Sequence, residues 1–225
     1  MKEVKRNFTQ RKKEIETYFE FLEKILNNNI INWEDNSQER ISGRLRRILK
    51  ANIFLLLYNL AESSISAAIE QIHLSIENDV DVSFDDIKDQ IKIDLIKNLK
   101  NNKNPEKFIK EINQISTDII TSCFIKKKLF PGNLDSCKIR EVAKKYGFST
   151  FTDFHKTKNG EKLKKVKDNR NDLAHGVFSF EDIGKHYTLP DIKDYKEEII
   201  SYLEQIIDNI EKYIDNKEYK IKAEK

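Results

Sequence analysis

The sequence contains few of the residues that interrupt or cross-link a chain. Its 225 residues include two cysteines, three prolines and six glycines. Cys123 and Cys137 are spaced unlike the paired ligands of a zinc site and are too few for a disulfide framework, so we expect reduced, buried thiols. The scarcity of glycine and proline leaves long uninterrupted stretches, which favours helix.

Long apolar runs are also lacking. The longest strongly apolar run, from Ile53 to Tyr58, is far shorter than the ~20 residues that cross a bilayer. The N-terminal residues have no apolar segment typical of a signal peptide. The sequence therefore predicts a soluble, cytoplasmic protein with no membrane contact.

No excess of one charge marks the whole chain, since 41 Lys and Arg balance 38 Asp and Glu for a net charge of +3. A strongly basic nucleic-acid-binding domain is excluded, and only local charge can indicate such a partner. The sequence also lacks a P-loop, a glycine-rich nucleotide fingerprint and a catalytic Ser or Cys signature. The histidines lack metal-ligand spacing, so we predict no metal and no cofactor.

Apolar residues recur at helical spacing through most of the chain, which predicts an all-α fold. An opening helix carries Phe19 and Leu22 on its apolar stripe and should end in the Asn cluster at 27–29. A second helical region should start after Asn36 and Ser37, with a break near Gly43, and run to about Ile76. Its central part is apolar on more than one face, as expected of a core helix enclosed by others.

Start and stop signals predict the remaining helices. We expect them from the Ser83 and Asp86 capping box to about Lys100, from Pro105 to about Ile119, from the Asp135 cap to Gly147, from about Glu161 to Gly176, and from about Pro190 toward the C-terminus. The last helix should pack back on the core helix. Together these elements predict a single helical-bundle domain, 1–225, with short connecting loops.

The segment Asp168-Asn-Arg-Asn-Asp-Leu-Ala-His-Gly176 concentrates chemically active side chains in two helical turns. Arg170 offers a planar cation suited to phosphate, and His175 can exchange a proton near neutral pH. Asn171 lies four residues before His175, so it can orient the ring or contact a substrate. The plainer alternative is that Arg170 pairs with Asp172 or another acid, while His175 caps the helix.

The heptapeptide Arg-Asn-Asp-Leu-Ala-His-Gly resembles the R-x4-H signature of the HEPN superfamily. Two further blocks, Lys50 to Ile69 and Gly132 to Phe148, resemble the MAE-type bacterial HEPN-like nucleases, and so does the stretch from Ser179. The resemblance covers roughly residues 40–185. The first forty residues and the last helix are interpreted from periodicity alone.

The resemblance implies a helical homodimer in which two R-x4-H motifs form a composite active site for metal-independent cleavage of RNA. Arg170 and His175 carry over as catalytic residues, and Asn171 occupies a polar position that relatives also fill. The expected products are a 2′,3′-cyclic phosphate and a 5′-hydroxyl, in a toxin or antiphage setting with an antitoxin or activating partner. Val177 stands where one toxin branch has a modified Tyr, so that form of control is not expected. The alternative is a catalytically silent HEPN dimer that acts as a scaffold or binds RNA or nucleotide.

Two acids and four lysines complete the predicted site. Glu62 and Asp172 are supporting candidates; Glu62 could orient Arg170 or His175, or could bond Tyr58 or a neighbouring lysine. The lysines that precede the motif make its helix locally basic, which favours RNA backbone, although a merely solvated face fits equally. These RNA-binding candidates are Lys162, Lys164, Lys165 and Lys167.

Two other segments give weaker indications. His73 lies among apolar residues of the core helix, so we expect a packed and hydrogen-bonded ring. The helix from Asp135 to Gly147 resembles part of a helix-turn-helix, which leaves a DNA-binding regulator as a third hypothesis. That hypothesis lacks a convincing partner helix in the sequence.

Overall fold

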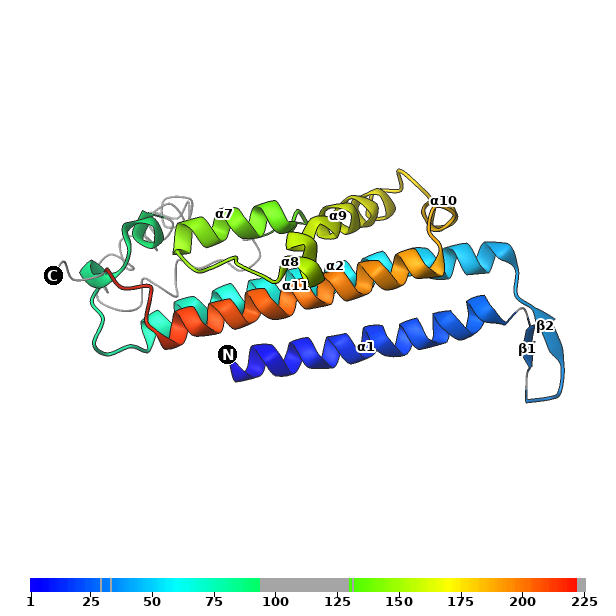
Figure 1. Cartoon of the computed structure of the whole chain (residues 1–225), viewed down its shortest axis with the longest axis horizontal. Helices are drawn as coiled ribbons and strands as arrows, with labels where there is room; N and C mark the ends of the chain where they lie inside the picture. Colours follow the sequence, from blue (N-terminus) through cyan, green and yellow to red (C-terminus); the bar gives the residue numbers. More distant parts are fainter. Residues whose placement is uncertain (29, 33, 94–129, 131, 222–225) are drawn as a thin grey trace, which may run out of the picture.

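Three long helices run side by side in the computed structural model, which describes residues 1–28, 30–32, 34–93, 130 and 132–221 (Figure 1). They are α1 (Lys2–Asn27), α2 (Gly43–Glu77) and α11 (Leu189–Asp215). The helices α2 and α11 run in the same direction, and α1 runs against both. The predicted all-α bundle is confirmed, and so is the packing of the last helix on the core helix.

Short helices form a further layer along this bundle (Figure 1). They are α7 (Ser136–Tyr146), α8 (Phe154–Thr157), α9 (Glu161–Ala174) and α10 (Phe180–Gly184), with 3-10 turns η1 (Phe84–Asp86) and η2 (Lys158–Gly160). Both α9 and α10 contact α2, and α9 also contacts α11. The motif helix therefore rests directly on the core helix.

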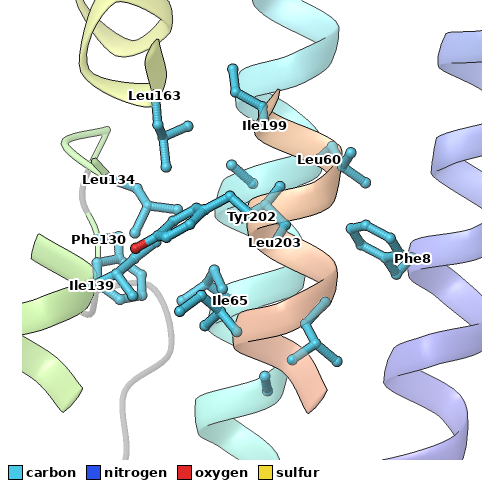
Figure 2. Packing of buried hydrophobic residues seen from close by; sticks show 14 of the residues in the cluster. Phe8, Leu60, Ile65, Phe130, Leu134, Ile139, Leu163, Ile199, Tyr202 and Leu203 are labelled. Carbon is cyan, nitrogen blue, oxygen red and sulfur yellow. The ribbon is translucent and has the colours of Figure 1, made fainter. Parts of the chain in front are cut away.

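The helix α2 is apolar because it is enclosed. Most of its apolar window is buried by the other helices, although its length and composition alone would suffice to cross a membrane. Leu60 on α2 lies beside Phe8 of α1, and Leu203 and Ile199 of α11 belong to the same buried cluster (Figure 2). Each fully buried aliphatic side chain contributes about 1.5–3 kcal/mol, so this contact of three helices holds the fold together.

Local capping signals fix α7 as predicted. The carboxylate of Asp135 accepts a hydrogen bond from the amide of Lys138 at 2.9 Å. Gly147 closes the helix with φ of +85°, a left-handed conformation that glycine adopts without steric cost. Ile139, Val142 and other apolar residues of α7 are buried.

The start of α9 is held by α11 rather than by its own cap. Gly160 precedes the helix and has no capping side chain. The buried carboxylate of Glu198, on α11, accepts a hydrogen bond from the amide of Lys162 at 2.9 Å. The ring of Tyr202 fills the space beside Gly160, where an added Cβ would lie 2.7 Å from it. These contacts fix the position from which α9 extends toward the motif.

The predicted start of the core helix is wrong. Residues on both sides of Asn36 and Ser37 form an antiparallel hairpin of β1 (Ile30–Asn32) and β2 (Gln38–Arg40), with Asn36 at φ +63° in the turn. The helix begins at Gly43, and the hydroxyl of Ser42 caps it. Asn is tolerated at positive φ, so the same residue type serves a turn as readily as a helix cap.

The Ser83 and Asp86 capping box is present, but it opens the single 3-10 turn η1 rather than a long helix. Ile87 then forms an isolated bridge with Lys220, and residues 89–93 are helical. The bridge interrupts the helix because the C-terminal segment supplies a partner that only the tertiary fold brings near. The predicted helix end at Lys100 and the helix from Pro105 to Ile119 lie outside the described residues.

The prediction of buried thiols is wrong for Cys137, which is reduced but exposed. It lies on the solvent face of α7, where its sulfur accepts a hydrogen bond from Arg140 at 3.2 Å. Cys123 lies outside the described residues.

We expect His73 to make the free energy of unfolding depend on pH. Its ring is buried on α2, and its Nε2 lies 2.7 Å from the hydroxyl of Tyr146. The prediction of a packed and hydrogen-bonded ring is confirmed. Burial lowers the pKa of His73 from 6.5 to about 4, so folding favours the neutral ring. This stabilisation is complete above pH 6.5 and is lost as pH falls toward 4, by roughly 3 kcal/mol in total.

The measurement is urea unfolding of wild type and His73→Gln at several pH values between 7 and 5. We expect the free energy of unfolding to fall with decreasing pH in the wild type and to change less in the variant, which cannot gain a proton. Equal slopes in the two proteins would contradict the assignment to His73.

Candidate active site

Arg170 is held in place by an aromatic ring and an amide. Its Cζ lies 4.8 Å from the centroid of the Tyr58 ring, and its Nη1 donates to Oδ1 of Asn171 at 2.9 Å. Gly132 passes so close that an added Cβ would lie 3.0 Å from Nη1. Among the described residues no carboxylate forms an ion pair with Arg170. The side chain is thus positioned, yet its charge stays available to an anion.

Tyr58 and Glu62 form the support beneath this guanidinium. The hydroxyl of Tyr58 accepts from the amide of Leu134 at 3.1 Å, and Glu62 accepts from the amide of Gly132 at 3.1 Å. Burial raises the pKa of Tyr58, and the neighbouring Glu62 adds to that rise, so the phenol stays neutral. A neutral phenol keeps the ring face favourable for the cation above it.

Glu62 bonds Tyr58, as one of the two alternatives held, and it affects Arg170 only through intermediate residues. It bonds Tyr58 and the backbone of Gly132, and these two residues contact Arg170. It is half-buried on α2, one helical turn after Tyr58. No direct bond from Glu62 to Arg170 or His175 is found in the described part of the chain.

His175 is exposed at the C-terminal end of α9. Its amide donates to the carbonyl of Asn171 at 2.9 Å, so it caps the helix through its backbone. Gly176 follows with φ of +68° and turns the chain back. Within the described residues the imidazole has no hydrogen-bond or ion-pair partner, so it can meet a substrate or a second protein copy.

The two other predicted residues, Asn171 and Asp172, make different contacts in the last turn of α9. Asn171 bonds Arg170, whereas the carbonyl of Asp172 accepts from the amides of Val177 and Phe178, at 2.9 and 3.4 Å. These bonds fold the loop after His175 back against the helix end. The structure therefore brings Asn171, rather than Asp172, to the guanidinium.

Two of the four predicted RNA-binding lysines are already paired. Lys167 lies 2.7 Å from Asp135, and this bond raises the pKa of Lys167. Lys162 bonds Asp194 and lies 3.3 Å from Glu198. These ion pairs tie α9 to α7 and α11, and a phosphate would have to compete with them.

Lys164 and Lys165 are exposed on the same helix. Neither has an ion-pair partner among the residues that the structure describes. They remain the predicted contacts for RNA backbone. In that same part of the chain, no group of three or more His, Cys, Asp or Glu could hold a metal ion.

Tyr58 and the backbone of Gly132 also contact Arg170, although neither was among the predicted site residues. Tyr58 precedes Glu62 by four positions, the spacing that places two side chains on one helix face. That spacing was the available signal. Gly132 gave none, since its approach to Arg170 depends on how the chain before α7 packs.

A comparison with protein families shows which family the chain belongs to. The model of the MAE_28990-like HEPN family matches residues 1–219. The chain belongs to the HEPN superfamily. The match includes all of α1 and α11, so the HEPN domain extends well beyond the 40–185 region that the motifs indicated. No curated protein and no solved structure was found to match the chain.

Membership of the HEPN superfamily indicates what the pair Arg170 and His175 at the end of α9 could do. HEPN domains are often ribonucleases or toxins, and they commonly dimerise and bind RNA. In this HEPN domain the Arg is supported from beneath and the His is open to solvent. That combination suits the binding of a phosphodiester rather than a purely structural ion pair.

Proposed function

We propose that this HEPN domain is a metal-independent endoribonuclease. The observation that supports it is the state of Arg170, a positioned guanidinium without a carboxylate partner among the described residues, on the same helix end as the exposed His175. A cation poised for phosphate and a histidine free to move a proton are the two groups that RNA transesterification needs.

His175 acts as the general base. It takes the proton from a ribose 2′-hydroxyl, and the 2′-oxygen attacks the adjacent phosphorus while the bond to the 5′-oxygen breaks. Arg170 stabilises the negative charge that develops on the phosphoryl oxygens. The products are a 2′,3′-cyclic phosphate and a 5′-hydroxyl.

The leaving 5′-oxygen needs a proton, and a second copy of the chain can supply it. In a homodimer whose motif helices meet, the protonated imidazole of one protomer serves as the acid while that of the other serves as the base. The exposure of His175 and Val177 leaves this end of α9 open to such a contact. The composite active site is therefore part of the proposal.

Glu62 acts in this proposal as a positioning residue. Its carboxylate accepts a hydrogen bond from the Gly132 amide and bonds the Tyr58 side chain. Both of these residues contact Arg170 and so position its guanidinium. Lys164 and Lys165 contribute charge for the RNA backbone. The enzyme works in the cytoplasm as a toxin or antiphage effector, restrained by an antitoxin or released by an activating partner.

The alternative is a silent HEPN dimer that binds RNA without cutting it. In that case the bond from Arg170 to Asn171 would serve only to fix the helix end. The two functions differ in whether RNA is cleaved while it is bound.

The deciding experiment incubates total RNA and transfer RNA with wild type and Arg170→Ala in EDTA, and analyses the new ends. We expect cyclic phosphate and 5′-hydroxyl ends from the wild type and at least ~10²-fold slower cleavage by the variant. RNA that stays intact with a folded, dimeric wild type that still binds it would support the silent scaffold.

A further inference from the structure

A pocket of about 440 Å³ lies beside the motif, on the other flank of α9 from Arg170. It is lined by residues of α9, α10, α11 and the loops that join them, including Asn169, Asp172, Phe178, His186, Tyr187 and Tyr195. Its volume is in the range of pockets that hold small ligands. The proposed chemistry of Arg170 and His175 does not use this pocket.

Aromatic rings form much of its wall. Tyr187 packs with a centroid distance of 4.6 Å to Phe54 and 5.7 Å to Tyr195, and these contacts fix its ring. Phe178 lines the same pocket but is 51% exposed. One face of the pocket is thus rigid, and a large apolar ring stands at its rim.

One polar side chain of the pocket is buried and held in place. Asn169 is 3% exposed, and its amide nitrogen donates to the hydroxyl of Tyr187 at 2.8 Å. That bond orients the amide. Asp172 adds a carboxylate that has no hydrogen-bond or ion-pair partner within the described residues.

The loop after the motif connects this pocket with His175. The amides of Val177 and Phe178 bond the carbonyl of Asp172, so Phe178 is folded back beside the last turn of the helix that ends at His175. Lys165 and His186 lie on the pocket wall, where they can meet a phosphate. A nucleotide whose ribose reaches His175 can therefore direct its base toward Phe178.

From this arrangement we infer that the pocket binds a nucleobase of single-stranded RNA, stacked against Phe178 and bonded at its edge by Asp172. Single-stranded RNA is recognised by such stacking on aromatic rings with hydrogen bonds to base edges. The inference rests on the proposed function, since it assigns a base-binding subsite to the same RNA.

The free acceptor predicts which bases fit. An ionised carboxylate only accepts hydrogen bonds, and adenine, cytosine and guanine each carry an exocyclic amino group that can donate to it. Uracil has no amino group, and its single edge donor, N3–H, lies between two carbonyl oxygens that repel a carboxylate. The pocket should therefore prefer amino-bearing bases over uracil.

The test measures binding of fluorescent A4, C4 and U4 oligoribonucleotides by anisotropy, in a His175→Ala background in which cleavage should be slow. We expect Phe178→Ala to weaken binding of all three by about tenfold, as loss of one stacked base does. Asp172→Asn should reduce the preference for A4 and C4 over U4, because an amide can donate to uracil. Phe151→Ala is the matched control, since Phe151 is an exposed phenylalanine outside the pocket.

Circular dichroism on each variant verifies the fold. Unchanged affinity in Phe178→Ala, an unchanged base preference in Asp172→Asn, or no binding of any oligonucleotide at low salt would overturn the inference. The proposed function fails separately, if wild type does not cleave RNA although these variants alter its binding. Cleavage by wild type with no effect of either variant would retain the nuclease and remove the pocket.

Discussion

Replacement of His175 by alanine is expected to lower the rate of RNA cleavage by about 10²–10⁴-fold, the usual contribution of a general acid or base. The fold should be unaffected, because the imidazole is exposed and residue 175 caps α9 through its backbone amide. Single-turnover cleavage of a defined oligoribonucleotide measures the effect. Affinity for RNA, measured separately, should change far less than the rate.

His155→Ala is the matched control for this prediction. His155 is also exposed, but it lies on α8, which precedes the start of α9, whereas the motif lies at the end of α9. Its loss should leave cleavage within about twofold of wild type. Equal loss in both variants, or full activity in His175→Ala, would contradict the role given to His175.

Gly184→Ala is expected to destabilise the protein by roughly 3 kcal/mol or more, at the upper end of overpacking effects. At Gly184 the helix α10 lies directly on the backbone of α2, and an added Cβ would lie 1.8 Å from the carbonyl oxygen of Arg47. Backbone atoms cannot move aside as a flexible side chain can. The whole of α10 must shift, and it follows the motif loop within a few residues.

Thermal and urea unfolding measure this loss, with Gly43→Ala as the control. Gly43 is in a helix too, but an added Cβ there meets nothing within 4 Å, so the substitution should be neutral or slightly stabilising. Cleavage by Gly184→Ala should fall together with stability. A Gly184→Ala protein as stable as wild type would show that α10 does not pack as described.

Local signals predicted the helices where their hydrogen bonds lie close in sequence. Asp135 and Gly147 mark the ends of α7 through contacts within a few residues, and α1 ends at Asn27, in the predicted Asn cluster. Periodicity similarly identified α2 as the core helix. The hairpin at 30–40 escaped because Asn and Ser favour turns and helix caps alike.

The motif was identified from the sequence because Arg170 and His175 lie within two turns of one helix. The local spacing predicted that both would lie near its C-terminal end, and the structure has α9 end at Ala174. It could not predict that Lys162 and Lys167 are engaged by Glu198 and Asp135, since those partners are more than thirty positions away.

The sequence alone was enough to predict the helical class, the family and the two residues on which the proposed chemistry depends. Tertiary structure alone decided how they are supported: Glu62 reaches the amide of Gly132 across 70 positions, and Leu134 bonds Tyr58 across 76. The difference comes from how far apart the interacting residues lie along the chain. Helix periodicity and caps depend on neighbours along the chain, whereas the support of Arg170 and the walls of the base pocket depend on packing among α2, α9, α10 and α11, which only the whole folded chain specifies.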